Sequence, residues 1–414
     1  MIRQLAGLAR RARSCNATAA RNMSSVPQTD EWSLFPRQCE GNVYAVNWSL
    51  CEDGVVPVGD AFRNARVSML TKKVGGKVTA GKLDASKPAY SGKYSISESG
   101  DSISHEEFSE LIAAQHQHLS SGIELFVEDA ALGALGAIRN GVRVVTDDAA
   151  TALIARALLM PTPPAEVNHR ARFKGWNFDP RWLNGKPEWN GSFYDIPAES
   201  TVAQAGQRPI VAFVGGPGDA VSVQFVESEE EIVGANVVVG GSAPVMALVD
   251  GLGLAATVLL NTQQPGALAL ACTSMVKGKE TAVVVGADEE VLGAIAQSGN
   301  LYGAYHNIIS PLGVSALWNG YIGPAAGSPA ACPTPAVIVG GKTVLCVEPN
   351  NMAHPATHIV FYEKGAARSK LSADEAVKRL VGLTDESKEA AIQALLKGAS
   401  VSVIGKAADV GSIF

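Results

Sequence analysis

The sequence of 414 residues has few of the patterns that indicate a metal site or a nucleic-acid surface. Its six cysteines form no CxxC pair, which gives no signal for a zinc or thioredoxin-like motif and favours free, mostly buried thiols. The 34 Lys and Arg are outnumbered by 40 Asp and Glu, so nucleic acid is not expected as a main partner. With 47% apolar and 18% charged residues, the chain has the composition of a globular protein.

Long uninterrupted hydrophobic runs are also missing. The nearest to one is the stretch 237–260, which Gly240-Gly241-Ser242, Pro244 and Asp250 divide into shorter pieces. This pattern predicts a buried strand, a turn and a buried helix, so no transmembrane helix is expected. The sequence has no internal repeat and no low-complexity segment.

Acidic residues are absent from residues 1–29, which contain five arginines and several alanines and serines. Leu5, Leu8 and Ala12 can share one helical face opposite the arginines. These features are typical of a mitochondrial presequence and differ from a secretory signal, which has a continuous apolar centre. We expect import into the mitochondrial matrix and cleavage near residues 23–25; the alternative is a disordered basic tail.

From residue 104 onward, short apolar strands alternate with amphipathic helices, the pattern of an α/β protein. The expected strands cover residues 123–127, 142–146, 210–214, 235–239, 281–285, 336–339 and 359–362. The expected helices cover residues 104–119, 147–160, 245–259, 289–296, 372–381 and 385–397. Ser104, Ser372 and Asp385 are candidate N-caps, and Gly398 is a candidate stop.

Four segments resemble the ATP-dependent phosphoenolpyruvate carboxykinases, in the family's order. They are the passage IELFVEDAALGALGAIRNGVRVVTDDAATALIARALLMP with the following FKGWNFDP, the stretch ANVVVGGSAPVMALVDGLGLAATVLLN, the strands LALACTSMVKGKETAVVVG and the tail HPATHIVFYEKGAARSKLSADEAVKRLVG. The resemblance implies a two-lobed α/β fold with mixed sheets and flanking helices. It places an N-terminal carboxykinase-like domain at 30–262 and a truncated, degenerate nucleotide domain with C-terminal helices at 263–414.

The phosphate loop of that family is missing. A phosphate loop ends in Gly-Lys-Thr, so that backbone N–H groups and one lysine cradle the phosphates. Here the strand 281–285 is followed by Gly286-Ala287-Asp288-Glu289-Glu290, with no such tripeptide near it. Three carboxylates in this place would repel phosphate oxygens, so we expect no nucleotide to bind.

The family's other functional positions are also replaced. The metal-binding His corresponds to Ala271, beside Cys272, and the lysine pair falls near Leu248 and Val249. The remaining correspondences place the Asp pair near Ala304 and Tyr305, and the substrate Arg near Pro88, ahead of the retained Lys93 and Tyr94. Since residues 320–349 are condensed and little follows the last family helix, a second substrate Arg and the adenine pocket are missing too. We therefore predict no catalytic, cofactor-binding or metal-binding residue, and no enzymatic activity.

Other chemistry-bearing groups have simpler explanations. His116 and His118, two apart on a helix, do not share a face, so a solvated helix end is favoured over a metal site. His354 and His358 have zinc-like spacing, but Pro355 and the following strand argue against a helix, and a structural role is favoured.

Several acidic and glycine-rich clusters also have structural explanations that are simpler than a functional site. Helix N-termini and solvated faces explain the acidic groups better than acid–base chemistry, and turn geometry explains the glycine clusters better than phosphate binding. Ser242 and Ser274 have no triad spacing. The acidic groups are Asp147-Asp148, Asp288-Glu289-Glu290 and Glu227 with 229–231; the glycine clusters are 215–218 and 240–241.

The predicted function is that of a non-catalytic mitochondrial pseudoenzyme, an accessory subunit of a respiratory complex or the ATP synthase, peripheral to the inner membrane. Its aromatic segment 173–194 is the candidate interface, although these aromatic side chains could instead pack inside the chain. The alternative is a protein that binds a small organic acid in the vestigial cleft; a third possibility is an enzyme of a different reaction. Copurification in a large complex would favour the first, and a dicarboxylate thermal shift the second.

Overall fold

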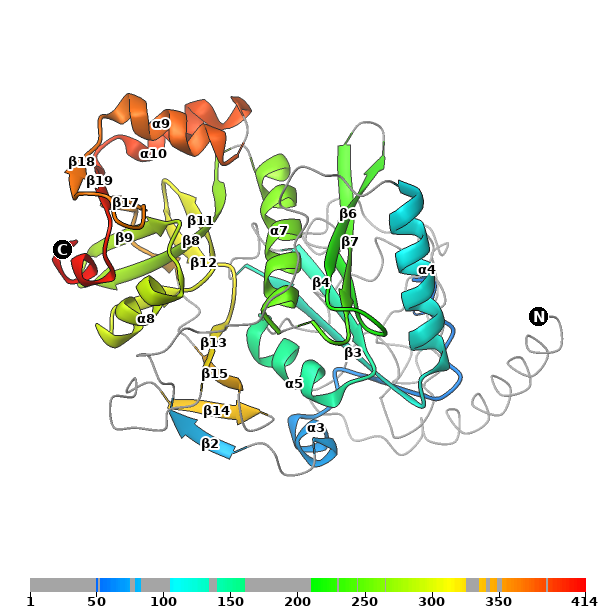
Figure 1. The fold of residues 1–414 in the computed structure, drawn as a ribbon. Helices are drawn as coiled ribbons and strands as arrows, with labels where there is room; N and C mark the ends of the chain where they lie inside the picture. Colours follow the sequence, from blue (N-terminus) through cyan, green and yellow to red (C-terminus); the bar gives the residue numbers. More distant parts are fainter. Residues whose placement is uncertain are drawn as a thin grey trace, which may run out of the picture.

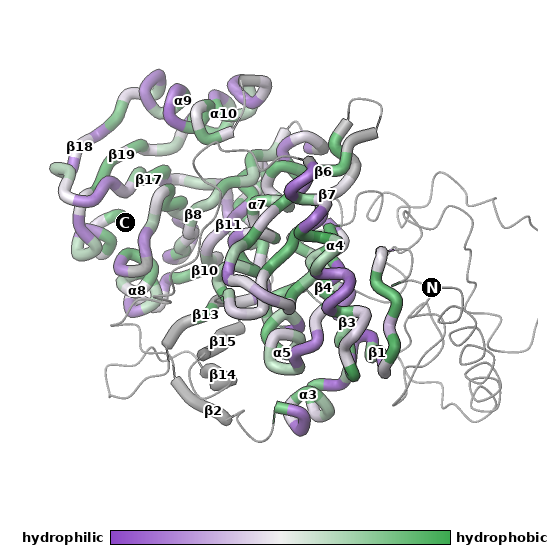
Figure 2. Tube along the Cα trace, turned by 45° about the vertical axis from the view of Figure 1, so that its right-hand side comes forward, coloured by the Kyte–Doolittle hydropathy of each residue, from purple (hydrophilic) through white to green (hydrophobic). Residues whose placement is uncertain are grey.

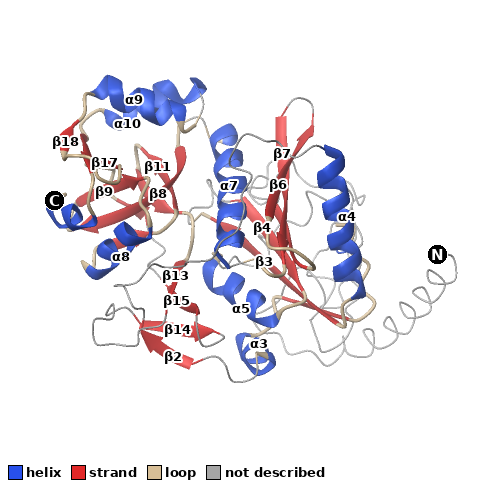
Figure 3. Cartoon of the chain, viewed as in Figure 1, coloured by secondary structure: helices blue, strands red, loops and turns tan. Residues whose placement is uncertain are grey.

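The described part of the chain, in a computed structural model, is an α/β protein with two mixed sheets, one small antiparallel sheet and flanking helices (Figures 1 and 3). The structure describes residues 50, 53–74, 79–82, 105–133, 140–160, 210–228, 231–243, 245–264, 266–324, 335–339, 343–347, 352–384 and 386–414. The presequence 1–29, the aromatic segment 173–194 and Pro88, Lys93 and Tyr94 lie outside these residues.

The first sheet has six strands in the order β1-β3-β4-β5-β7-β6. Strands β4, β5 and β7 are mutually parallel. Helix α4 covers one face, while α5 and α7 cover the other (Figure 3). The strands are β1 (Asp60–Arg63), β3 (Glu124–Leu132), β4 (Asn140–Thr146), β5 (Ile210–Gly215), β6 (Val221–Ser228) and β7 (Glu231–Gly240); the helices are α3 (Val67–Lys73), α4 (His105–Ser121), α5 (Ala149–Leu158) and α7 (Val245–Gln263).

The second sheet follows α7 and has the order β16-β12-β11-β8-β9-β17-β19-β18, with β10 also on β8. Helices α9 and α10 lie over one face and α8 lies on the other (Figure 1). Figure 2 shows hydrophilic and hydrophobic residues alternating along α9, as in an amphipathic surface helix. The strands are β8 (Leu268–Lys277), β9 (Glu280–Val285), β10 (Leu301–Gly303), β11 (His306–Ser310), β12 (Gly313–Ala316), β16 (Met352–Ala353), β17 (His358–Tyr362), β18 (Ser369–Lys370) and β19 (Ser400–Ile404); the helices are α8 (Glu289–Gln297), α9 (Ala373–Gly382) and α10 (Glu389–Leu396), with short 3-10 turns η5 (Glu386–Lys388) and η6 (Ala407–Ser412).

A small third sheet joins segments that are distant in sequence. Its order is β13-β15-β14-β2, all antiparallel, so the early strand β2 pairs with β14 more than 250 residues later. These strands are β2 (Thr79–Lys82), β13 (Gly320–Pro324), β14 (Pro335–Val339) and β15 (Thr343–Val347).

Helix α7 is the central helix and packs between the first and second sheets (Figure 1). Glycines allow this close approach: a Cβ on Gly251 would lie 2.7 Å from the Val221 side chain, and one on Gly253 would lie 2.2 Å from the His306 ring. By length and composition α7 could cross a membrane, but 56% of its apolar window is buried inside the protein. The predicted buried strand, turn and helix at 237–260 are therefore confirmed as β7, its turn and α7.

Most expected helices and strands are present, with three differences. Strand β3 continues to Leu132 rather than ending at Val127, because Glu128 and Asp129 are buried in ion pairs instead of facing solvent. The last predicted helix starts as the 3-10 turn η5 and continues as α10; at this junction the buried Lys388 ammonium donates to the carbonyls of Gln264 and Ala267. The predictions omitted helix α3 and many of the strands, namely β1, β2, β6, β10, β11, β12, β13, β15, β16, β18 and β19.

Candidate functional site

The carboxyl ends of β4, β5 and β7 lie at the same edge of the first sheet because these strands are parallel. Crevices of open α/β sheets form at such edges, where the chain leaves each strand. Here the edge borders a cavity of about 360 Å³, which the first turns of α5 and α7 also line. It is the candidate site of this protein, and we call it the strand-end cavity.

Two glycine-rich loops form one wall of the strand-end cavity. Gly215, Gly216 and Gly218 have positive φ angles of 148°, 66° and 93°, a backbone region that favours glycine. The Gly241 amide donates to the Gly216 carbonyl and the Ser242 amide to the Gly218 carbonyl. These contacts confirm turn geometry as the role of both glycine clusters.

The charged groups lie beside the first of these loops, where a Cβ on Gly215 would be 2.8 Å from Asp147 Oδ1. His118 Nε2 lies 2.8 Å from Asp147 Oδ2, so a residue of α4 holds a carboxylate at the end of β4. Asp148 accepts hydrogen bonds from the Thr151 amide and hydroxyl and thereby caps α5. The prediction that this acidic pair lies at a helix N-terminus is thus confirmed for Asp148. Asp147 does not cap the helix and pairs with His118 instead.

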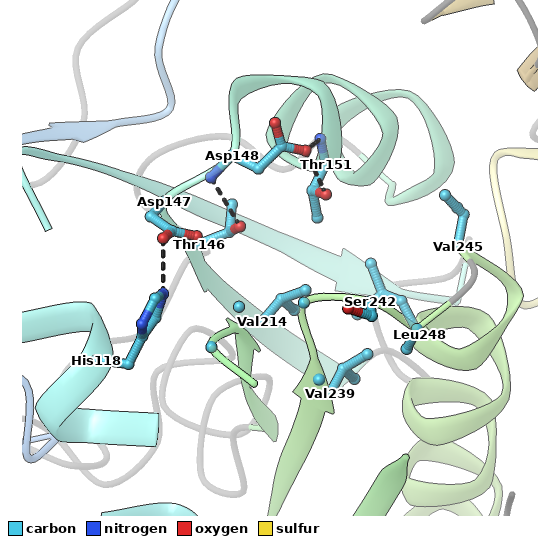
Figure 4. A pocket seen from close by; sticks show the side chains of 15 residues that line it. His118, Thr146, Asp147, Asp148, Thr151, Val214, Val239, Ser242, Val245 and Leu248 are labelled. Atoms are coloured by element: carbon cyan, nitrogen blue, oxygen red, sulfur yellow. Dashed lines mark hydrogen bonds and ion pairs between the residues drawn. The ribbon is translucent and has the colours of Figure 1, made fainter. Parts of the chain in front are cut away.

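Figure 4 shows the two poles of the strand-end cavity. His118 and Asp147 lie on one side, and Ser242, Val245 and Leu248 lie on the other. Val214 and Val239 are drawn between them. The cavity therefore combines an acidic pole, an apolar floor and the N-terminus of α7, whose first turn contains no acidic residue.

A buried ion network supports the strands next to this site. Arg143 donates to both Asp129 oxygens, at 2.8 and 3.1 Å, and to Asp53 at 2.8 Å, while Arg63 also pairs with Asp129. Burial opposes the charge of Arg143, but Asp129 and Asp53 outweigh it and raise its pKa above the ordinary value. The network joins β1, β3 and β4 on the α4 side of the sheet.

Glu128 points to the other face of β3 and pairs with Arg156 of α5 at 3.1 Å. Burial raises the pKa of Glu128 to about 8, and the arginine only partly opposes this. A raised carboxyl pKa can mark a general acid. This carboxyl, however, is 2% exposed and is not among the residues that line the strand-end cavity.

The residues that the carboxykinase resemblance assigns to ligand positions have mostly apolar surroundings in the fold. Leu248, Val249 and Ala304 are buried in the apolar core. Ala271 is exposed on β8, and its neighbour Cys272 is buried, which raises its thiol pKa to about 12. No group of three potential metal ligands occurs among the described residues.

The strand-to-helix junction after β9 is a capped helix start. Gly286 has a φ of 76°, and Asp288 accepts a hydrogen bond from the Val291 amide as the N-cap of α8. The sequence does contain Gly341-Lys342-Thr343, but Thr343 begins β15, which pairs antiparallel with β14. A phosphate loop runs from a strand into a helix, so this tripeptide does not have the required context.

The expected solvated helix end at His116 and His118 is wrong. The His116 ring packs against Phe213 with centroids 4.5 Å apart, and His118 pairs with Asp147. Both face the sheet because the C-terminal end of α4 packs on β5, a tertiary contact that helical spacing alone does not reveal. This histidine–aspartate pair is what sequence reasoning missed.

The remaining candidate residues have structural environments. His358 lies on β17 and contacts the Ser400 hydroxyl at 2.8 Å, and the Ser274 hydroxyl donates to Asn307 at 2.7 Å. His354 is exposed. Ser242 lines the strand-end cavity. The side chains of Glu227 and residues 229–231 lie outside the described part of the chain.

No family model matches this sequence, and no curated protein matches it. The function has to be argued from the fold and the site.

Proposed function

We propose that this chain is a catalytically inactive, carboxykinase-like protein with a two-lobed fold and a truncated nucleotide lobe. In this proposal it serves as an accessory subunit of a mitochondrial assembly, a respiratory complex or the ATP synthase. The proposal places it in the matrix, peripheral to the inner membrane, after removal of residues 1–29. It requires no nucleotide, metal or nucleic acid.

One observation carries the inactive part of the proposal. The residues at the family's lysine and aspartate positions, Leu248, Val249 and Ala304, are components of the hydrophobic core. A cation at Val249 or a carboxylate at Ala304 would lose its hydration without a partner, which costs several kcal/mol. The fold therefore uses these positions for packing. The arginine-rich, acid-free N-terminus supports the compartment.

The experiment is a native gel of solubilised mitochondria, probed for this chain. We expect the protein in a band far larger than its own 43.0 kDa, together with subunits of one complex. Calorimetry of the purified protein with Mg-ATP should give no binding heat at millimolar nucleotide. Migration as a free monomer would overturn the proposed accessory role. Micromolar nucleotide affinity would overturn the proposal that the protein is catalytically inactive.

A second function, binding of a small metabolite, is favoured by the strand-end cavity. A cavity of about 360 Å³ at the ends of parallel strands is large enough for a small organic molecule. It lies at the edge of the first sheet, and Leu248 is the one cavity residue that also corresponds to a family ligand. A thermal shift of the full chain with a panel of organic acids that includes amino acids tests this function.

A further inference from the structure

The strand-end cavity has a distinct charge inventory. Two carboxylates and one histidine line it, and the lining residues that the structure describes include no lysine or arginine. A phosphate or dicarboxylate ligand needs cationic partners, so this lining does not suit a strongly anionic ligand. The acidic pole instead favours a group that carries positive charge and donates hydrogen bonds.

Asp147 is the group that would receive such a donor. His118 holds one of its oxygens at 2.8 Å. The other oxygen, Oδ1, lies against the loop after β5, where a Cβ on Gly215 would be 2.8 Å from it. Asp148 caps the first turn of α5 through its Oδ2 alone, so each of the two aspartates has an Oδ1 that can still accept. Asp147 is the one that does not serve as a helix cap, and it is therefore the group that we assign to a ligand.

The pole at the start of α7, next to Ser242 and Val245, instead favours a negatively charged group. The first backbone N–H groups of a helix have no intrahelical partner and carry partial positive charge. Asp148 compensates the start of α5, but no acidic residue lies in the first turn of α7. A carboxylate next to Ser242 and Val245 would meet these amides. The valine and leucine floor between the poles suits a short chain of methylene groups.

We propose that the strand-end cavity binds a short aliphatic zwitterion, with its ammonium group at Asp147 and its carboxylate at the start of α7. The inference rests on the second function above, small-metabolite binding, and names its ligand class. It is independent of membership in a mitochondrial assembly.

Three isosteric probes separate the two poles: 4-aminobutyrate carries both charges, n-butylamine only the cation and butyrate only the anion. The experiment is calorimetry on the purified full chain. We expect 4-aminobutyrate to bind at least about tenfold more tightly than either single-charge probe, since a charge-assisted hydrogen bond at each pole adds about that factor. Butylamine or butyrate binding as tightly as 4-aminobutyrate overturns the zwitterion, while leaving metabolite binding intact. Failure of all three probes overturns the inference, and the organic-acid panel then decides the second function separately.

Variants locate the binding. Asp147→Asn should weaken 4-aminobutyrate binding by about tenfold or more, because the ammonium loses its carboxylate partner. Asp219→Asn, a matched change at an exposed residue outside the lining, should leave affinity unchanged. Ala243→Phe should abolish binding by filling the cavity, and melts without ligand show that each variant is folded. Unchanged affinity in both folded variants, Asp147→Asn and Ala243→Phe, overturns the assignment to this cavity.

Discussion

At the scale of single residues, His306 shows how burial fixes a protonation state. Its ring lies against Gly253 of α7, and Trp318 Nε1 is 3.4 Å from its Nδ1, which fits a neutral imidazole that accepts there. Burial lowers the pKa of His306 to about 4. The histidine therefore stays neutral in the folded protein at pH values at which it is protonated in the unfolded chain.

This difference predicts a pH dependence of stability. Between pH 6.5 and 4 the unfolded chain binds a proton at this histidine that the folded protein does not bind, so the free energy of unfolding falls as the pH falls. A pKa shift of that size corresponds to about 3 kcal/mol in the free energy of unfolding, and this contribution is fully lost below pH 4. Urea unfolding from pH 7 to 4.5 measures it. The variant His306→Gln should show a shallower loss across this window, and an identical slope in both proteins would refute the prediction.

The buried ion network predicts a large effect of one substitution. Asp129 is shared by Arg63 and Arg143, so Asp129→Ala leaves two buried guanidinium groups without their common carboxylate. Removing one partner of a buried pair costs about 3–5 kcal/mol. The exposed Glu290, 4.0 Å from Lys364, is the control, since Glu290→Ala should change stability by less than about 0.5 kcal/mol. Equal midpoints of denaturation for the two variants would contradict the prediction.

At the scale of helices and strands, the packing of α7 decides the effect of its glycines. Glycine is about 1 kcal/mol less favourable than alanine inside a helix. At Gly253, however, an added Cβ would lie 2.2 Å from the His306 ring. We therefore expect Gly253→Ala to destabilise the protein, by about 1–3 kcal/mol, as in other overpacked cores.

Two further variants test the cause of this effect. Gly382, in the last turn of α9, has nothing within 4 Å of an added Cβ, so Gly382→Ala should be neutral or slightly stabilising. If the ring is the obstacle, His306→Ala should recover most of the loss caused by Gly253→Ala in a double-mutant cycle. Additive losses would show that another contact is responsible.

The sequence predicts the elements whose signals are local. The α9 start is an example, since Ser372 is the N-cap that was predicted, and the structure adds a capping box with Glu375. Strand β19 was missed because its stabilising partner, β17, lies about 40 residues earlier in the chain. The charged end of β3 was missed for the same reason. Arg63 and Arg143 pair with Asp129, and Arg156 pairs with Glu128 on the other face, so the partners that make this end compatible with a buried strand lie at least 14 residues away in sequence.

The strand-end cavity also depends on non-local contacts. The Asp148 cap is readable from sequence, because a cap lies next to the helix that it serves. The His118–Asp147 pair joins α4 and the end of β4, and the hydrogen-bonded glycine loops join β5 and β7. Only the sheet order brings these groups together, so sequence spacing could identify the residues but not the site.

At the scale of the whole molecule, the largest core crosses the expected domain boundary at residue 262. Trp318, Ile308 and Ile322 belong to the same buried cluster as the strands of the first sheet and α7. Backbone hydrogen bonds also cross this boundary: the Gly133 amide donates to the Leu317 carbonyl at 2.9 Å, and the Asn319 amide donates to the Leu158 carbonyl at 2.7 Å. The first sheet therefore depends on residues that follow the boundary.

We predict that residues 30–262 do not form a stable domain when expressed alone. The fragment would expose the face of α7 and α5 that Trp318 and its neighbours cover, and loss of one large buried aromatic side chain alone costs about 3–5 kcal/mol. That is comparable with the whole stability of many domains, about 5–15 kcal/mol. Circular dichroism should show no cooperative thermal transition for the fragment, whereas residues 30–414 should unfold cooperatively.

The variant Trp318→Ala in residues 30–414 separates a shared core from a fragment that merely aggregates. If the core is shared, this change lowers the stability of the first sheet as well as the second, because both contribute to the cluster around Trp318. Hydrogen exchange reads the two sheets separately, through amides of β5 and β9. The amides of β5 and those of β9 should both exchange faster in Trp318→Ala than in the unsubstituted protein. Protection of β5 amides that stays at the level of the unsubstituted protein, or a cooperative melt of the 30–262 fragment, would show that the first sheet is an independent domain.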